Sequence, residues 1–148
     1  MNLLALVAEA KKGDDISRLA EIMPYARFMG LAPENSTGEL LTRMRFAPQL
    51  IGNPILPALH GGTIGALLET AAIFQVLWEI DTTGIPKIIT FTVDYLRSGR
   101  PVDTLARAVV TKQGRRVVNV AVEAWQDDRS RPIASAKAHF LITPRESE

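Results

Sequence analysis

Glu69 is the residue whose side chain most needs a chemical explanation, because it lies inside the apolar segment HGGTIGALLETAAIFQVLWEI, residues 60–80. An ionised carboxylate among apolar side chains is unfavourable unless it is paired, solvated at a cleft or protonated. Burial raises the pKa of a carboxyl group, and a raised pKa suits a general base working near neutral pH. The alternative is a glutamate that faces solvent at a helix edge or is hydrogen-bonded to a neighbouring strand.

The tripeptide His60-Gly61-Gly62 stands where the helix of this segment should begin. The first backbone N–H groups of a helix have no partner within the helix, and glycines let a ligand approach them closely. Together with the helix dipole, these groups favour developing negative charge, such as that of an acyl-transfer intermediate. The motif indicates an oxyanion hole, although a lone histidine at such a position can equally be a local cap.

The separation of these two features predicts a second subunit. His60 and Glu69 are nine residues apart, which is about 13 Å along a helix that rises about 1.5 Å per residue. At that distance, two groups on one helix do not reach the same carbonyl carbon. If both act on one substrate, the helix start of one subunit must face the mid-helix carboxylate of another.

The elements that position these residues follow from hydrophobic periodicity. The segment 60–80 contains no proline and is apolar nearly all round, so this helix must be covered on more than one side. Alternating patterns predict strands. The turns between the strands that follow the helix are short, which predicts that these strands form an antiparallel meander in chain order. The expected strands are residues 40–46, 87–96, 103–112, 115–126 and 131–143. The predicted class is α+β, with a sheet curled around the helix and a partner subunit covering its other side.

The first part of the chain is expected to be more irregular. Apolar residues at helical spacing predict two short helices before residue 30, and the cluster at residues 33–38 predicts a turn. Three prolines and a glycine predict an irregular loop at residues 48–59.

The composition limits the classes of function. A chain of 148 residues needs only one core. Its net charge of +1 gives no electrostatic reason to expect nucleic-acid or membrane binding. The absence of cysteine excludes a thiolate nucleophile, and two histidines argue against a metal centre. No positively charged, apolar leader opens the sequence, so we expect a cytoplasmic protein.

Three segments resemble one enzyme family. The segment HGGTIGALLETAA, with an acid seven residues after Gly62, is similar to the helix start of the hotdog-fold acyl-CoA thioesterases of the phenylacetate-degradation and 4-hydroxybenzoyl-CoA type. The segments ITFTVDYLRSGRP and VVTKQGRRVVNVAVEAWQDDRSRPIASAKAHFLI resemble that family's later strands. The resemblance implies a long central helix wrapped by an antiparallel five- to six-stranded sheet. We expect this hotdog domain at residues 39–148, after an N-terminal helical extension at residues 1–38.

The resemblance also implies roles for individual residues. Glu69 would be the nucleophile or the general base that activates water, and the backbone at Gly61 and Gly62 would polarise the thioester carbonyl. His60 would orient that carbonyl or its loop. Asn53 is the candidate for an asparagine that precedes the histidine in the family, although the intervening PILPAL is about one residue longer than the family's spacing.

The implied substrate is an acyl-CoA with an aromatic or small-to-medium acyl group, and no separate cofactor is expected. The phosphates of coenzyme A call for arginine near the cleft mouth. The candidates are Arg97, Arg100, Arg115 and Arg116, which can alternatively be solvated turn residues. The implied assembly is a homodimer, or a homotetramer formed as a dimer of dimers.

Two other functions stay open at this stage. One is a hotdog 3-hydroxyacyl dehydratase or hydratase, but those enzymes typically begin the helix with Pro-Gly about five residues before the acid. The other is a non-catalytic acyl-CoA binding module. A DNA-binding sensor is not indicated, because residues 1–30 contain no basic helix-turn-helix pattern.

Overall fold

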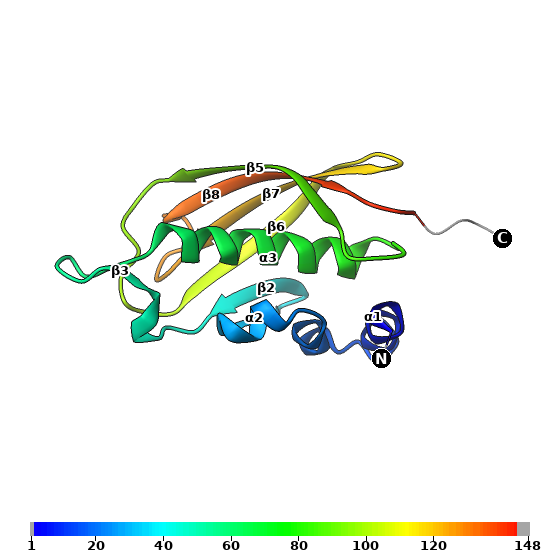
Figure 1. The fold of residues 1–148 in the computed structure, drawn as a ribbon, viewed down its shortest axis with the longest axis horizontal. Coiled ribbons are helices and arrows are strands. Elements are labelled where there is room, and N and C mark those ends of the chain that lie inside the picture. The colour runs from blue at the N-terminus through cyan, green and yellow to red at the C-terminus, as the bar shows by residue number, and fades with distance from the viewer. Residues whose placement is uncertain (1, 145–148) are drawn as a thin grey trace.

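The computed structural model describes residues 2–144, and its main sheet wraps around one long helix (Figure 1). Helix α3, Gly61–Glu79, lies against a six-stranded antiparallel sheet with the order β1-β2-β6-β7-β8-β5. The strands are β1 (Leu31–Ser36), β2 (Glu39–Met44), β5 (Lys87–Tyr95), β6 (Thr104–Gln113), β7 (Val117–Trp125) and β8 (Ala134–Leu141). The expected α+β hotdog architecture is therefore confirmed.

Helix α3 forms the centre of the core, as its apolar composition predicts. Leu67, Leu68 and Phe74 are fully buried, and each such side chain contributes about 1.5–3 kcal/mol relative to an exposed one. The sheet faces the helix with alternate side chains that are mostly small. They include Ala106, Ala108, Val120, Val122, Ala136 and Ala138, all of which are buried. Small side chains at these positions let the strands pack closely around the bulkier helix.

The predicted meander in chain order is wrong for β5. This strand pairs with β8, in a register that places Val93 opposite Ala136, and it forms one edge of the sheet. The connection at residues 96–103 instead passes the start of α3, where Leu59 donates a backbone hydrogen bond to Gly99 at 2.9 Å. Periodicity identifies a strand but does not specify its neighbour. The short-turn argument therefore applies only to the pairs β6–β7 and β7–β8.

The turn cluster predicted at residues 33–38 is only partly correct. Residues 31–36 form the other edge strand, β1, and only Thr37 and Gly38 make the turn into β2, with φ values of 50° and 83°. The side chain of Asn35 stabilises this turn by accepting a hydrogen bond from Gly38 N at 3.0 Å. An edge strand tolerates Pro33 because one side of its backbone needs no ladder partner.

The N-terminal segment forms helix α1 (Leu3–Lys12), a 3₁₀ helix (η1, Ile16–Ile22) and helix α2 (Pro24–Phe28). The two short helices expected before residue 30 are thus present, with α2 added after them. Lys11 ties α1 to the end of α3, because its Nζ donates to Ile80 O at 3.4 Å and to Asp81 at 3.3 Å. A domain boundary at residue 38 stays a prediction.

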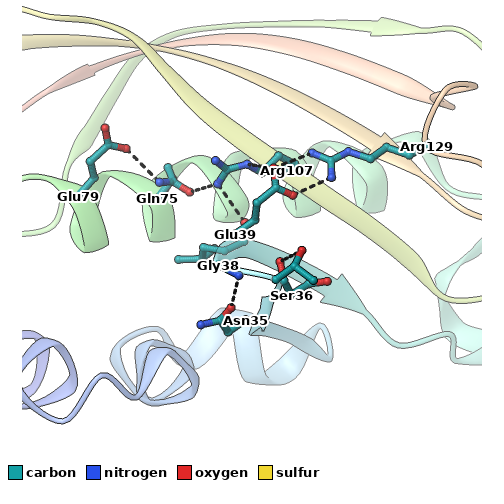
Figure 2. A network of polar contacts seen from close by, with 10 residues as sticks. Asn35, Ser36, Gly38, Glu39, Gln75, Glu79, Arg107 and Arg129 are labelled. Carbon is teal, nitrogen blue, oxygen red and sulfur yellow. Dashed lines mark hydrogen bonds and ion pairs between the residues drawn. The ribbon is translucent and has the colours of Figure 1, made fainter.

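A polar network fastens α3 to the sheet (Figure 2). Arg107 on β6 donates to Gln75 on α3 at 2.8 Å and to Leu40 O on β2 at 3.3 Å. The backbone pairing of β2 with β6 ends where Thr42 is opposite Ala106. Beyond that pair, the Arg107 side chain bridges the two strands. Because Gln75 lies about 240° around the helix from Glu69, this contact keeps Glu69 on a different face of α3.

Candidate active site

His60 is held firmly at the start of α3. Its backbone is extended, its N–H donates to Leu50 O at 2.9 Å, and its Nδ1 accepts from Gly62 N at 2.9 Å. Because Nδ1 is the acceptor, the neutral ring carries its proton on Nε2. The bond also engages the Gly62 N–H, whereas Gly61 N donates to no atom among the residues described. Of the two expected glycine donors, Gly61 is the one left free.

Gly52 packs directly against His60, a contact that no pattern in the sequence indicates. The predicted loop at residues 48–59 contains a short 3₁₀ helix (η2, Pro48–Leu50) and a two-stranded hairpin, β3 (Ile51–Asn53) and β4 (Ala58–Leu59). A Cβ at Gly52 would lie 2.6 Å from His60 Cα. An isolated glycine in a proline-rich loop does not distinguish such a packing role from a turn.

Tyr95 is a second residue that sequence reasoning missed. At the end of β5, its hydroxyl donates to Gly61 O at 2.8 Å, and its ring lies against Gly61. Beside it opens a cleft of about 350 Å³, whose lining includes Leu59, Gly61, Ile64 and Tyr95. This cleft brings apolar surface next to the free helix N-terminus, where developing negative charge is favoured.

Glu69 lies half-buried in the middle of α3. Burial raises the pKa of its carboxyl group above the ordinary value of 4.5. Within residues 2–144 it forms no hydrogen bond or ion pair, so the alternative of a bond to a neighbouring strand is wrong. Nine residues along the helix place Glu69 about 13 Å from His60 and on the opposite side. One chain therefore does not bring these two residues together.

Asn53 is the last residue of β3, where the turn of the β3–β4 hairpin begins. Its Oδ1 accepts from Ile55 N at 2.9 Å and from Leu56 N at 3.3 Å, so its oxygen stabilises the turn. The residue is exposed and is not part of the lining of the cleft beside Gly61. A catalytic contribution by Asn53 stays a prediction.

The four expected arginines divide into two groups. Arg97 lines the cleft, and Arg100 lies nearby in an ion pair with Asp127. Arg115 and Arg116 follow β6 at the end of the sheet where Gln113 pairs with Val118, far from the end near Leu105. Within one chain, these two do not join Arg97 at the cleft.

The long helix α3 packs against one antiparallel sheet, and its Gly-Gly start is capped by His60 and lies beside a cleft. These are the features of a hotdog domain. The sequence profile described as "Thioesterase superfamily" matches residues 56–133, more than half of the chain. The chain therefore belongs to the thioesterase superfamily, and it is a thioester hydrolase.

Individual relatives agree with this assignment. A protein of Salmonella typhimurium named medium/long-chain acyl-CoA thioesterase YigI is 29% identical over 135 residues, covering 81% of this chain and 86% of the relative. A crystal structure from Chromobacterium violaceum is 40% identical, with a TM-score of 0.75, and covers 95% of this chain and 98% of that one. A Bacillus halodurans protein solved with CoA is 19% identical, with a TM-score of 0.74 over 97% and 93% of the two chains, and shows the fold alone.

Helix α3 is also long and apolar enough to cross a membrane by length and composition. It is instead the core helix of the domain, with 61% of its most apolar window buried by the sheet and the N-terminal segment. Its apolar character is thus accounted for by burial in a soluble protein.

Proposed function

We propose that this protein hydrolyses acyl-CoA thioesters at a site built by two subunits, with the α3 start of one facing Glu69 of the other. The observation that carries the proposal is the separation of the α3 start from Glu69 within one chain. Among residues 2–144, the Gly61 N–H has no acceptor and lies at the cleft, whereas Glu69 has no partner and lies on another face of α3. A second copy of the chain supplies the Glu69 carboxylate that the α3 start lacks.

The free edge of β5 supports this assembly. It pairs with β8 on one side only, and Ile89 and Tyr95 on it are more than half exposed. Two-fold pairing of β5 with its copy would extend the sheet and set two α3 helices antiparallel. If the two-fold axis crosses α3 midway between Gly61 and Glu69, each Glu69 lies beside the start of the partner helix. We propose a homodimer of this kind, which can assemble further as a dimer of dimers.

The chemistry follows from the two halves of the site. The Gly61 N–H and the α3 dipole hold the oxygen of the thioester carbonyl, and the His60 ring orients the bound group. Glu69 takes a proton from water as the water oxygen attacks the carbonyl carbon. The tetrahedral oxyanion is stabilised at the helix start and collapses, expelling the CoA thiolate, which takes up a proton, and leaving the free acid. Direct attack by the Glu69 carboxylate, followed by hydrolysis of the resulting anhydride, is the alternative.

We place this activity in the cytoplasm, where coenzyme A serves as part of the substrate and the chain needs no separate cofactor. The half-buried carboxylate and the polarised helix start supply both the base and the oxyanion donor. Asn53, whose oxygen is used in its own turn, contributes by holding the hairpin that carries Gly52.

The preference of the enzyme for an acyl group is tested by measuring the release of CoA thiol from aromatic, short-, medium- and long-chain acyl-CoAs. We expect the highest kcat/KM with a medium-length straight acyl chain. Medium chains belong both to the small-to-medium acyl size expected from the sequence and to the medium and long chains in the name of the Salmonella relative. Preference for an aromatic group would instead favour the phenylacetate type. No turnover with any member, together with saturable binding of acyl-CoA, would make the protein a binding module and contradict hydrolysis.

The shared site is tested by mixing two inactive variants, His60→Ala and Glu69→Gln, through unfolding and refolding. In a mixed dimer one site carries both changes and the other carries neither. Half of the dimers in an equal mixture are mixed, and each has one intact site of two, so we expect about one quarter of the wild-type rate. Each variant refolded alone is the control. Absence of recovery in confirmed mixed dimers would show that both groups act within one chain.

A further inference from the structure

The β3–β4 hairpin presents two neighbouring apolar side chains to solvent at its tip. Ile55 is 89% exposed and Leu56 is 65% exposed, and Ile55 is the most exposed large apolar residue within residues 2–144. The hairpin projects beyond the start of α3, away from the body of the domain (Figure 1). Single apolar side chains at a surface are ordinary, but an adjacent pair on a projecting arm is a candidate contact surface.

This tip is held in one shape before any contact forms. Pro54 and Pro57 flank the apolar pair and restrict the backbone on either side of it. The Asn53 Oδ1 accepts hydrogen bonds from the backbone N–H groups of both tip residues, at 2.9 and 3.3 Å. A rigid tip loses little conformational entropy when it binds, which suits it to a lasting contact.

The two-fold arrangement proposed above places the partner helix beside this hairpin. With the axis midway between Gly61 and Glu69, α3 extends about four residues to one side of the axis and about fourteen to the other. The partner helix runs the opposite way, so it continues about 15 Å beyond the start of α3. The four residues of extended chain from Leu59 back to Ile55 span about 13 Å. The hairpin and the overhanging part of the partner helix therefore match in length.

The surface that each subunit offers in this region is apolar. Strand β5 runs back along α3, because Tyr95 at its end contacts Gly61 at the helix start. The first residues of β5 therefore accompany the second half of α3. Among them, Ile88 and Phe91 are half-buried against the core, and Ile89 is 52% exposed at a β-bulge. An apolar tip from the partner would cover these side chains.

The remainder of the proposed interface supplies few large apolar side chains. The part of α3 that one chain leaves partly exposed around Glu69 carries Gly62, Gly65 and Ala66. Pairing of the two β5 edges is mainly a backbone contact. A stable dimer buries about 800 Å² on each subunit, and its core is apolar. The hairpin tip and the start of β5 provide the larger side chains that such an interface needs.

We propose that the β3–β4 tip of each subunit packs against the start of β5 in the partner subunit, with Ile55 and Leu56 covering Ile89 of the partner subunit. The inference rests on the two-subunit arrangement of the proposed function, and it names a contact which that arrangement does not by itself require. Because Gly52 on the same hairpin packs against His60, this contact also makes assembly of the dimer hold the start of α3.

The test uses the absence of cysteine from the chain. Leu56→Cys carries a single thiol at the tip, and Phe28→Cys is the matched control, with a single thiol at a residue that is 78% exposed on α2. In a dimer confirmed by light scattering, maleimide should label position 56 about tenfold more slowly than position 28, because a covered thiol reacts only when the contact opens. Each rate is divided by that of the same variant unfolded in urea. Ile55→Cys repeats the measurement at the neighbouring position.

A second substitution tests the partner side of the contact. Ile89→Asp places a charge on the surface that the tip should cover, and Ile89 is exposed at a sheet edge, so the fold should tolerate the change. Combined with Leu56→Cys, it should restore labelling at the rate of the Phe28→Cys control. Slow labelling that persists in the double variant would place the tip against another surface and contradict the proposal.

Three further outcomes would reject the contact. They are equal labelling of positions 56 and 28 in the confirmed dimer, a chain that stays monomeric, and slow labelling only after phosphatidylcholine vesicles or decanoyl-CoA are added. The last result would assign the tip to lipid or to substrate. Release of CoA thiol by wild type is measured in parallel. Hydrolysis without protection rejects the contact and leaves the proposed function standing, whereas protection without hydrolysis supports the contact and rejects the function.

Discussion

Replacing Glu69 with glutamine should lower kcat by about two to four orders of magnitude, the usual contribution of a general base. Glutamine has nearly the same size and lacks the oxygen that accepts the proton from water. The substrate still binds through the helix start, so KM should change much less than kcat. The measurement is steady-state release of CoA thiol from the best acyl-CoA. A kcat within a few-fold of wild type would exclude Glu69 as base or nucleophile.

The pH profile separates loss of the base from a general disturbance of the fold. Because burial raises the pKa of Glu69, the carboxylate that activates water appears only as pH rises past a value above 4.5. In wild type, kcat/KM should therefore rise with pH through that point, and this limb should be absent from the residual activity of Glu69→Gln. An unchanged acid limb in the variant would assign the titration to another group.

Thermal unfolding supplies the control for Glu69→Gln. A carboxyl group whose folded pKa is raised contributes stability at low pH, and this is lost as pH rises through the folded value. The neutral glutamine avoids that loss. The variant should therefore be at least as stable as wild type above neutral pH, and the difference between them should shrink in acid. A melting temperature clearly below that of wild type would mean that the kinetic defect reflects damage to the fold.

Replacing Gly52 with alanine should lower kcat by about a hundredfold, although Gly52 touches no substrate. The added Cβ would lie 2.6 Å from His60 Cα and 2.9 Å from His60 Cβ, so the backbone at the start of α3 must move. Displacing a reacting geometry by about 1 Å costs about a hundredfold in rate. Overpacking of this kind also destabilises a fold by about 1–3 kcal/mol. The measurements are kcat with the best acyl-CoA and the free energy of unfolding in urea.

Gly84→Ala is the matched control for this substitution. A Cβ at Gly84 meets no atom within 4 Å, and the residue does not have a positive φ. This variant should keep both the activity and the stability of wild type. If Gly52→Ala behaves like Gly84→Ala, the hairpin does not position His60, and the start of α3 is held by its other contacts alone.

The sequence by itself determined the helix, most of the strands and the identity of the chemically notable residues. A proline-free segment that is apolar nearly all round can be stable in water only when it is covered, so residues 61–79 had to form a core helix. Alternation located β2, β5, β6, β7 and β8 to within a few residues, because one face of each strand is buried. Glu69 stood out because a carboxylate in such a helix is costly.

Only the tertiary structure decided which elements are neighbours and which side chains are engaged. The placement of β5 beside β8, the approach of Gly52 to His60 and the bond from Tyr95 to Gly61 are contacts between segments distant in sequence or in a loop without periodicity. The same holds for the arginines, since Arg100 is paired with Asp127 whereas Arg97 lines the cleft. Local patterns carry the preferences of single segments, whereas such contacts depend on how the whole chain packs.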